Sequence, residues 1–258
     1  MSDSFIFSTI QLTSAVVWTL FNYKYCHKHG FSKLKAFMMA GFNTVLTWSI
    51  IFLLSWMCNE FQGFGTQNAV RVFVTFPFII WVQAKIFNVN FRELSDRYAV
   101  GPVLTYFVGH IACMFVGCCH GFEYEEGTKL YSIAHALTGK NMLPQQLFEV
   151  LGAFITSLVI YYFFIKTKQN AGGRLFWWMT IAYGTQRFFF EFFRDNKKLF
   201  LIKEMEGALH HDPDIHGAAY WGISELALWA IGMIIVGAIM LIGLHIVDNK
   251  KTKEPVCA

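Results

Sequence analysis

A stripe of polar and ionisable side chains runs through an otherwise apolar segment near residue 187. Its members are spaced by three or four residues, so a helix would place them on one face: Thr180, Tyr183, Arg187, Glu191 and Arg194. An arginine at the centre of a membrane helix costs about 2.5–3.5 kcal/mol on insertion scales, and such residues usually face the bundle interior and serve function. We therefore favour a binding or catalytic site on this stripe over a ladder of ion pairs that only stabilises the helix.

A second candidate face closes an earlier apolar segment. It contains Tyr106, His110, Cys113, Gly117 and His120. Two imidazoles and a thiol on one face could bind zinc. The adjacent Cys118 and Cys119 do not have a usual zinc-finger spacing, so a metal site is the weaker interpretation. Close helix packing around small residues, with a hydrogen-bonded histidine, is a further alternative.

A third polar group begins the next apolar segment. Pro144 suits the first turn of a helix, which would turn Gln145, Gln146 and Glu149 to one side. A carboxylate at this depth should face the bundle interior. The histidines and aspartates of 210–216 could also hold a metal, but a solvated loop is the favoured interpretation.

These residues are set in a strongly apolar chain of 258 residues. It is 55% hydrophobic and only 15% charged, whereas about 25% of residues are charged in soluble domains. Seven stretches approach the length and polarity that a spanning helix needs, at residues 5–23, 36–58, 70–87, 98–119, 146–165, 174–194 and 221–246. The predicted fold is an all-α, polytopic membrane protein with about seven transmembrane helices.

The connections predict how these helices cross the membrane. Most of the 21 Lys and Arg residues lie in connections that are cytoplasmic if the N-terminus is outside and the C-terminus inside. The two long outer connections, about 120–145 and 195–220, would form a small extracytoplasmic cap. Residues 1–258 are predicted to form one membrane domain. The basic residues form no single arm, so the net charge of +4 does not indicate nucleic-acid binding.

The segments that carry these residues, taken together, resemble the prolipoprotein diacylglyceryl transferase family. The family's Y-G-x-x-R-F-x-x-E-F-x-R motif is matched by Tyr183, Gly184, Arg187, Phe188, Glu191, Phe192 and Arg194. Weaker matches lie at 109–121, 143–149 and 221–226, so that the resemblance runs from about Phe91 to Leu241. Three features depart from the pattern: a His-Gly-Gly element ahead of Phe91 is absent, His110 stands in place of an arginine, and Leu143 replaces a histidine.

The resemblance implies a bacterial plasma-membrane enzyme of lipoprotein biosynthesis. Such an enzyme transfers the diacylglyceryl group of phosphatidylglycerol to the cysteine of a prolipoprotein signal peptide, without a cofactor. On this basis Arg187 and Arg194 would bind phosphate with Tyr183 and Gln146, Glu149 and Glu191 would orient the arginines, and His110 or His120 would take the thiol proton. Two alternatives stay open: a relative with a different acceptor or no activity, and a metal- or redox-handling protein built on the cysteines.

Overall fold

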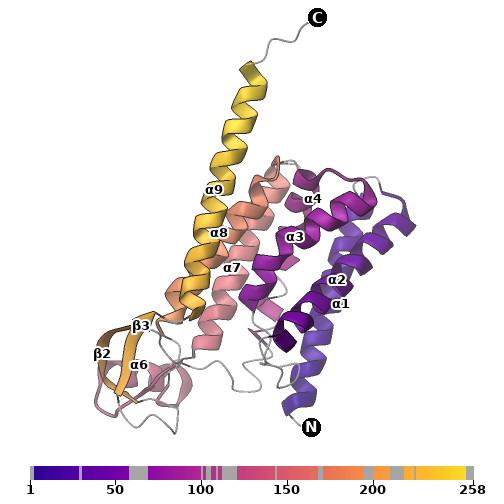
Figure 1. Cartoon of the computed structure of the whole chain (residues 1–258). Helices are drawn as coiled ribbons and strands as arrows, with labels where there is room; N and C mark the ends of the chain where they lie inside the picture. Colours follow the sequence, from indigo (N-terminus) through magenta and orange to yellow (C-terminus); the bar gives the residue numbers. More distant parts are fainter. Residues whose placement is uncertain are drawn as a thin grey trace, which may run out of the picture.

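The computed structural model describes most of the chain. The described residues are 3–28, 31–57, 69–99, 101–102, 106–108, 110–111, 121–142, 144–167, 171–193, 200–209, 218–223 and 225–253. Helices form the body, and a small sheet lies at one end (Figure 1). The helical class predicted from the sequence is confirmed for this part of the chain.

The long helices lie in two groups. The helix bounds are α1 Asp3–Lys28, α2 Lys33–Met57, α3 Ala69–Phe87, α4 Phe91–Tyr98, α6 Lys129–Thr138, α7 Gln145–Lys166, α8 Arg174–Glu191 and α9 Glu225–Lys253. In Figure 1, α7, α8 and α9 stand side by side, and α1 to α4 form the other group. The N-terminus and the sheet lie at the same end, and the C-terminus lies at the opposite end.

The hydropathy of these helices agrees with a membrane location. Within the described residues, Gln145–Lys166 and Leu226–Asn249 are long and apolar enough to cross a membrane by length and composition. A shorter apolar helix covers Thr75–Phe87. The number of spans and the side on which each terminus lies stay predictions.

Close approach of α8 to α9 depends on two glycines. A methyl group on Gly184 would lie 2.9 Å from the carbonyl oxygen of Ala230, and one on Gly237 would lie 2.6 Å from Cγ1 of Ile181. Small residues allow helix backbones to approach in this way inside membranes. Gly184 of the tyrosine-to-arginine motif therefore has a packing role beside the polar stripe.

A carboxylate from α4 holds the start of α8. Asp96 is fully buried and accepts hydrogen bonds from the backbone N–H groups of Gly173 at 2.8 Å and Leu175 at 2.9 Å. The first N–H groups of a helix have no partner within the helix, and a nearby negative charge is favourable there. Gly173 itself has φ +84° and provides no side-chain cap, so Asp96 supplies the cap from another helix.

A neutral hydrogen-bond network joins α1, α2, α3 and α4. The indole N–H of Trp18 donates to Oδ1 of Asn43 at 3.0 Å, and the Asn43 amide donates to Oε1 of Gln83 at 3.0 Å. Gln83 Nε2 donates in turn to the Met39 carbonyl at 2.7 Å and to the Tyr98 hydroxyl at 2.8 Å. The side chains of Asn43 and Gln83 are fully buried, and each of their amide atoms has a partner.

The two long connections that were predicted to form a cap contain strands of a small sheet, which was not predicted from the sequence. Strands β1 Glu123–Tyr124, β2 Phe200–Leu209 and β3 Ala218–Ile223 pair antiparallel in the order β1-β2-β3. Residues 221–223, which were expected to begin the last spanning helix, belong to β3 instead. Strand pairing satisfies their backbone groups before α9 starts at Glu225.

Two further boundaries differ from prediction. Residues 91–98 form the separate helix α4, whose first turn is capped by the Asn90 side chain accepting from the N–H of Arg92 at 2.9 Å. Helix α8 ends at Glu191, three residues before the predicted end of that span. The helical stripe therefore ends at Glu191, and Arg194 lies outside the described residues.

Candidate active site

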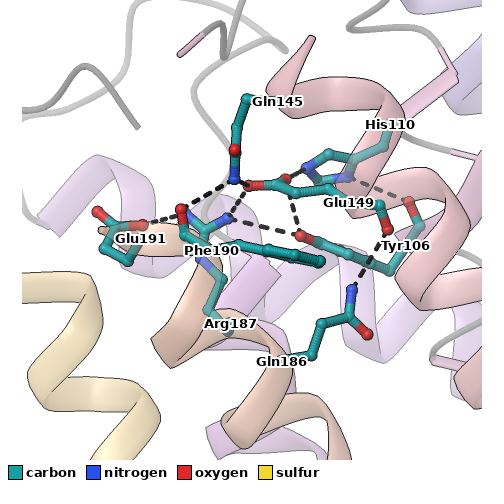
Figure 2. Close-up of polar contacts among 8 residues, drawn as sticks. All are labelled: Tyr106, His110, Gln145, Glu149, Gln186, Arg187, Phe190 and Glu191. Carbon is teal, nitrogen blue, oxygen red and sulfur yellow. Dashed lines mark hydrogen bonds and ion pairs between the residues drawn. The ribbon is translucent and has the colours of Figure 1, made fainter. Parts of the chain in front are cut away.

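Three helical segments bring ionisable side chains together inside the bundle. Tyr106 and His110 come from the helical residues 106–108 and 110–111. Glu149 comes from the first turns of α7, and Arg187 and Glu191 come from the end of α8 (Figure 2). All except His110 are buried, and the His110 side chain is 12% exposed. Ion pairs in such surroundings are weakly screened.

Arg187 is held by two carboxylates at once. Its Nη1 lies 2.8 Å from Oε1 of Glu149, and its Nη2 lies 2.9 Å from Oε2 of Glu191. Glu191 is one turn along the same helix, whereas Glu149 is 38 residues away in the sequence. The planar guanidinium can serve both acceptors because its donors form a rigid fork.

Glu149 links the arginine to the earlier helix. Its Oε2 accepts a hydrogen bond from the Tyr106 hydroxyl at 2.9 Å and forms an ion pair with Nε2 of His110. The Tyr106 hydroxyl is also 3.5 Å from Nη1 of Arg187, at the limit of hydrogen-bond length. Both carboxylate oxygens are therefore engaged, and one fully buried glutamate connects a guanidinium, a phenol and an imidazole.

His110 has an acceptor at each ring nitrogen. Nε2 faces Glu149, and Nδ1 lies 3.2 Å from the carbonyl oxygen of Tyr106. The ring also packs on Tyr106, with a centroid distance of 4.0 Å. His110 is therefore tied to Glu149 through one nitrogen and to its own helix through the other.

Two glutamines hold the cluster in place. Gln145 Nε2 donates to the Phe190 carbonyl at 2.9 Å and, over 3.5 Å, approaches Oε1 of Glu149. Gln186 Nε2 donates to the Glu149 backbone carbonyl at 3.3 Å, while its Oε1 accepts from the Thr156 hydroxyl at 3.1 Å. These contacts fix α7 against α8 at the depth of Glu149.

Close packing at Gly152 makes room for Gln186. A methyl group on Gly152 would lie 2.8 Å from the amide of Gln186 and 2.9 Å from the Phe190 ring. A larger residue on α7 would therefore push the amide away from Glu149.

The remaining predicted residues differ in their position. Tyr183 is fully buried and meets the Tyr106 ring edge-on at a centroid distance of 4.9 Å. Thr180 is buried but donates to its own helix, to the Phe176 carbonyl at 2.9 Å. Gln146 is also buried, beside Gln145 at the start of α7.

Several predicted residues lie outside the described part of the chain. These are Cys113, Cys118, Cys119, His120, Arg194 and the cluster at 210–216. Among the described residues, no group of three or more His, Cys, Asp or Glu could hold a metal ion.

Sequence reasoning did not assign site roles to Tyr106, Gln145 or Gln186. A signal existed for the first two, because Tyr106 shares a helical face with His110 and Gln145 lies one turn before Glu149. Gln186 lies off the polar stripe, and only the facing Gly152 could have indicated it.

Comparison with known proteins gives two matches. Residues 62–243, more than half of the chain, match the family described as prolipoprotein diacylglyceryl transferase. The chain is also 30% identical over 111 residues to phosphatidylglycerol–prolipoprotein diacylglyceryl transferase 2 of Clostridium perfringens (strain 13 / Type A). That alignment covers 42% of this chain and 43% of the relative.

Proposed function

The chain belongs to the prolipoprotein diacylglyceryl transferase family, and on that premise we propose that it transfers the diacylglyceryl group of phosphatidylglycerol to a prolipoprotein. The acceptor would be the cysteine thiol of the signal peptide. The name of the Clostridium perfringens relative supports donor and acceptor alike. We place the enzyme in the bacterial plasma membrane as one domain of about seven spans, with the N-terminus outside and the C-terminus in the cytoplasm.

The proposed reaction exchanges one bond at a glyceryl carbon. The thiolate sulfur attacks that carbon, a C–S bond forms, and the C–O bond to phosphate breaks. Glycerol phosphate leaves with the electron pair, and the thiol proton passes to a base. Such a step needs positive charge beside the departing phosphate and a group that generates the thiolate, because the thiol is a poor nucleophile.

Arg187 is the residue that we assign to the phosphate. Guanidinium binds phosphate through paired hydrogen bonds, and two carboxylates hold this one in a fixed orientation. Its Nε is buried and has no hydrogen-bond partner among the described residues, which leaves a donor for a ligand. Arg194, Tyr183 and Gln146 complete the proposed lipid site.

His110 is better placed to supply charge than to accept the thiol proton. Both of its ring nitrogens face oxygen acceptors, as the donors of an arginine would at the position where the family has one. His120, outside the described residues, is then the candidate base, since imidazole titrates near neutral pH. Glu149 orients both cations and Glu191 orients Arg187.

Arg187 and His110 both pair with Glu149 inside the bundle, and this arrangement is the main support for the proposed transfer. The deciding experiment is complementation of a bacterial strain depleted of its own diacylglyceryl transferase. Growth and lipoprotein modification are expected with the wild-type chain and not with Arg187→Gln. Failure of the wild-type chain, when membrane expression is verified, would contradict the proposed transfer.

Two alternatives make different predictions. A relative that keeps the phospholipid site but uses another acceptor would co-purify with anionic phospholipid and fail complementation. A metal- or redox-handling protein would carry stoichiometric metal or lose function when Cys118 and Cys119 are replaced. Metal analysis and lipid analysis of one purified sample separate these classes.

A further inference from the structure

A buried amide at the start of α7 has one end fixed and one end without a partner. Gln145 is fully buried, and its Nε2 donates to the Phe190 carbonyl at 2.9 Å while also approaching Glu149 (Figure 2). Its Oε1 is buried without a hydrogen-bond partner among the described residues. Nε of Arg187, in the same cluster, is likewise buried without a hydrogen-bond partner among the described residues.

The orientation of this amide is determined by its neighbours. Rotating it by a half-turn would bring Oε1 against a backbone carbonyl and a carboxylate, and three acceptors would then face one another. The nitrogen must therefore point toward Phe190 and Glu149, and the oxygen must be the acceptor that points elsewhere. Its partner has to be a donor.

Buried polar atoms without partners are costly, and a native protein has few of them. Here the two side chains are neighbours, since Nη1 of Arg187 and Nε2 of Gln145 both contact Oε1 of Glu149, and each also has a polar atom without a partner among the described residues. A ligand that satisfies both would present an acceptor and, a short distance away, a donor. A phosphate followed by a hydroxyl has this arrangement.

We propose that Gln145 recognises the headgroup of the phospholipid. Its Oε1 accepts a hydrogen bond from a headgroup hydroxyl that lies beside the phosphate bound by Arg187. This inference rests on the proposed function and assigns a specificity-determining residue to it. A hydroxyl fits better than an ammonium group, because both oxygens of Glu149 are already engaged and a neutral amide supplies no charge to hold a cation.

The test compares two lipids that differ only in hydroxyl groups. Phosphatidylglycerol and phosphatidylpropanol have the same charge and headgroup length, and phosphatidylethanolamine provides the ammonium alternative. Binding is measured by native mass spectrometry of the purified full chain in detergent. Wild type is expected to favour phosphatidylglycerol over phosphatidylpropanol by about tenfold, as for one buried acceptor satisfied or left unsatisfied.

The variant Gln145→Met keeps the length of the side chain and removes the amide. It should bind the two lipids equally, because the acceptor that distinguishes them is gone while Arg187 still contacts phosphate. The matched control is Gln83→Met, which removes an equally buried amide from the neutral network. That variant should keep the wild-type preference even though its melting temperature falls.

Each other result overturns the inference. If Gln145→Met still preferred phosphatidylglycerol over phosphatidylpropanol, another residue would recognise the hydroxyl. In that case, loss of lipid binding in Arg187→Gln would still support the proposed phosphate site. A wild-type preference for phosphatidylethanolamine would assign the subsite to an ammonium. If Gln145→Met does not fold, the wild-type protein still tests the role of Gln145, because equal binding of the glycerol and propanol headgroups would reject that role. Absence of binding of either lipid to wild type rejects the proposed function as well.

Discussion

Two buried polar clusters in the described part of the chain differ in charge and in completeness. The first joins α1 to α4 through Trp18, Asn43, Gln83 and Tyr98, without a charged member. The second joins α7, α8 and residues 106–111 through two carboxylates, a guanidinium and an imidazole. The residues of both clusters are largely buried, so the difference between the clusters is chemical and does not follow from burial.

The amides show the difference most directly. Gln83 and Gln145 are both fully buried, but each amide atom of Gln83 has a partner, whereas Oε1 of Gln145 has none among the described residues. A complete neutral network fixes which helices pack together. The charged network leaves an acceptor on Gln145 and a donor on Arg187 without partners among the described residues, as the proposed lipid site requires.

The most severe way to disturb the charged cluster is Arg187→Gln. It leaves Glu191 buried without its cation and Glu149 with His110 alone, so the free energy of unfolding should fall by about 3–5 kcal/mol. Arg187→Lys keeps the charge but not the fork, and should fold while losing most phosphatidylglycerol binding. Melting temperature and bound lipid are measured on both variants. Wild-type lipid binding in both would refute the phosphate assignment.

The equivalent disturbance of the neutral cluster is Gln83→Met. Asn43 and Tyr98 then lose a partner in the interior, which should cost about 1–3 kcal/mol. Because no ligand contact is involved, lipid affinity per folded molecule should not change. Thermal unfolding and lipid binding together test this separation. Selective loss of lipid binding would show that the two clusters are not independent.

Asp96 lies where the two regions meet, since it is on α4 beside Tyr98 but caps α8. Asp96→Asn places an amide N–H₂ against backbone N–H donors and should cost about 1–2 kcal/mol. Burial raises the pKa of the Asp96 carboxyl, although backbone N–H groups partly oppose this. The contribution of Asp96 is therefore greatest below the unfolded pKa and declines as pH rises through the folded value.

The difference in melting temperature between wild type and Asp96→Asn should accordingly narrow with rising pH. If the difference in melting temperature widened with rising pH, the charged form of Asp96 would be the better cap, and the raised pKa would be contradicted. Unfolding in detergent over a series of buffers measures it.

His110→Arg should have a small effect if His110 supplies charge. Arginine restores the residue of the family motif, so lipid binding and transfer should stay within about threefold of wild type, which is less than about 0.7 kcal/mol. His110→Gln should lose binding about tenfold or more, because the cation is gone. Complete loss of transfer in His110→Arg, with lipid binding intact, would instead make His110 the base.

The smallest change is expected from Cys118→Ser combined with Cys119→Ser. The proposed nucleophile belongs to the substrate, so transfer should not fall in the double variant. Transfer is measured with a signal-peptide substrate against wild type in the same membranes. Total loss would favour the redox alternative and would remove the charged cluster from the centre of the mechanism.

The sequence predicted the elements whose hydrophobic pattern is strong. Helices α7 and α9 follow from long apolar runs, and the Arg187–Glu191 pair follows from helical spacing. Helix α4 was missed because its charged side chains interrupt the hydropathy signal, although Asn90 followed by Glu93 is a capping sequence. The cap strands have no regular alternation that distinguishes them from loops.

Contacts between residues far apart in the sequence were harder to predict. Helical spacing cannot indicate that Glu149 meets Arg187, and only the family resemblance brought these segments together. The polar partners Tyr106, Gln145 and Gln186 depend on how α7 turns against α8. That rotation depends on the close contact of Gly152 with Gln186 and Phe190, which no single segment reveals.

The distance along the chain between Glu149 and Arg187 has a consequence for biosynthesis. The 38 residues between them correspond to about 2–8 s of translation at roughly 5–20 residues per second. During that interval α7 has been made and its guanidinium partner has not. His110, Tyr106 and Gln145 are already present, so a nascent chain halted after α7 could shelter the glutamate with these neighbours alone. Ribosome-stalled intermediates ending before and after Arg187 should therefore differ in how firmly α7 is retained in the bilayer.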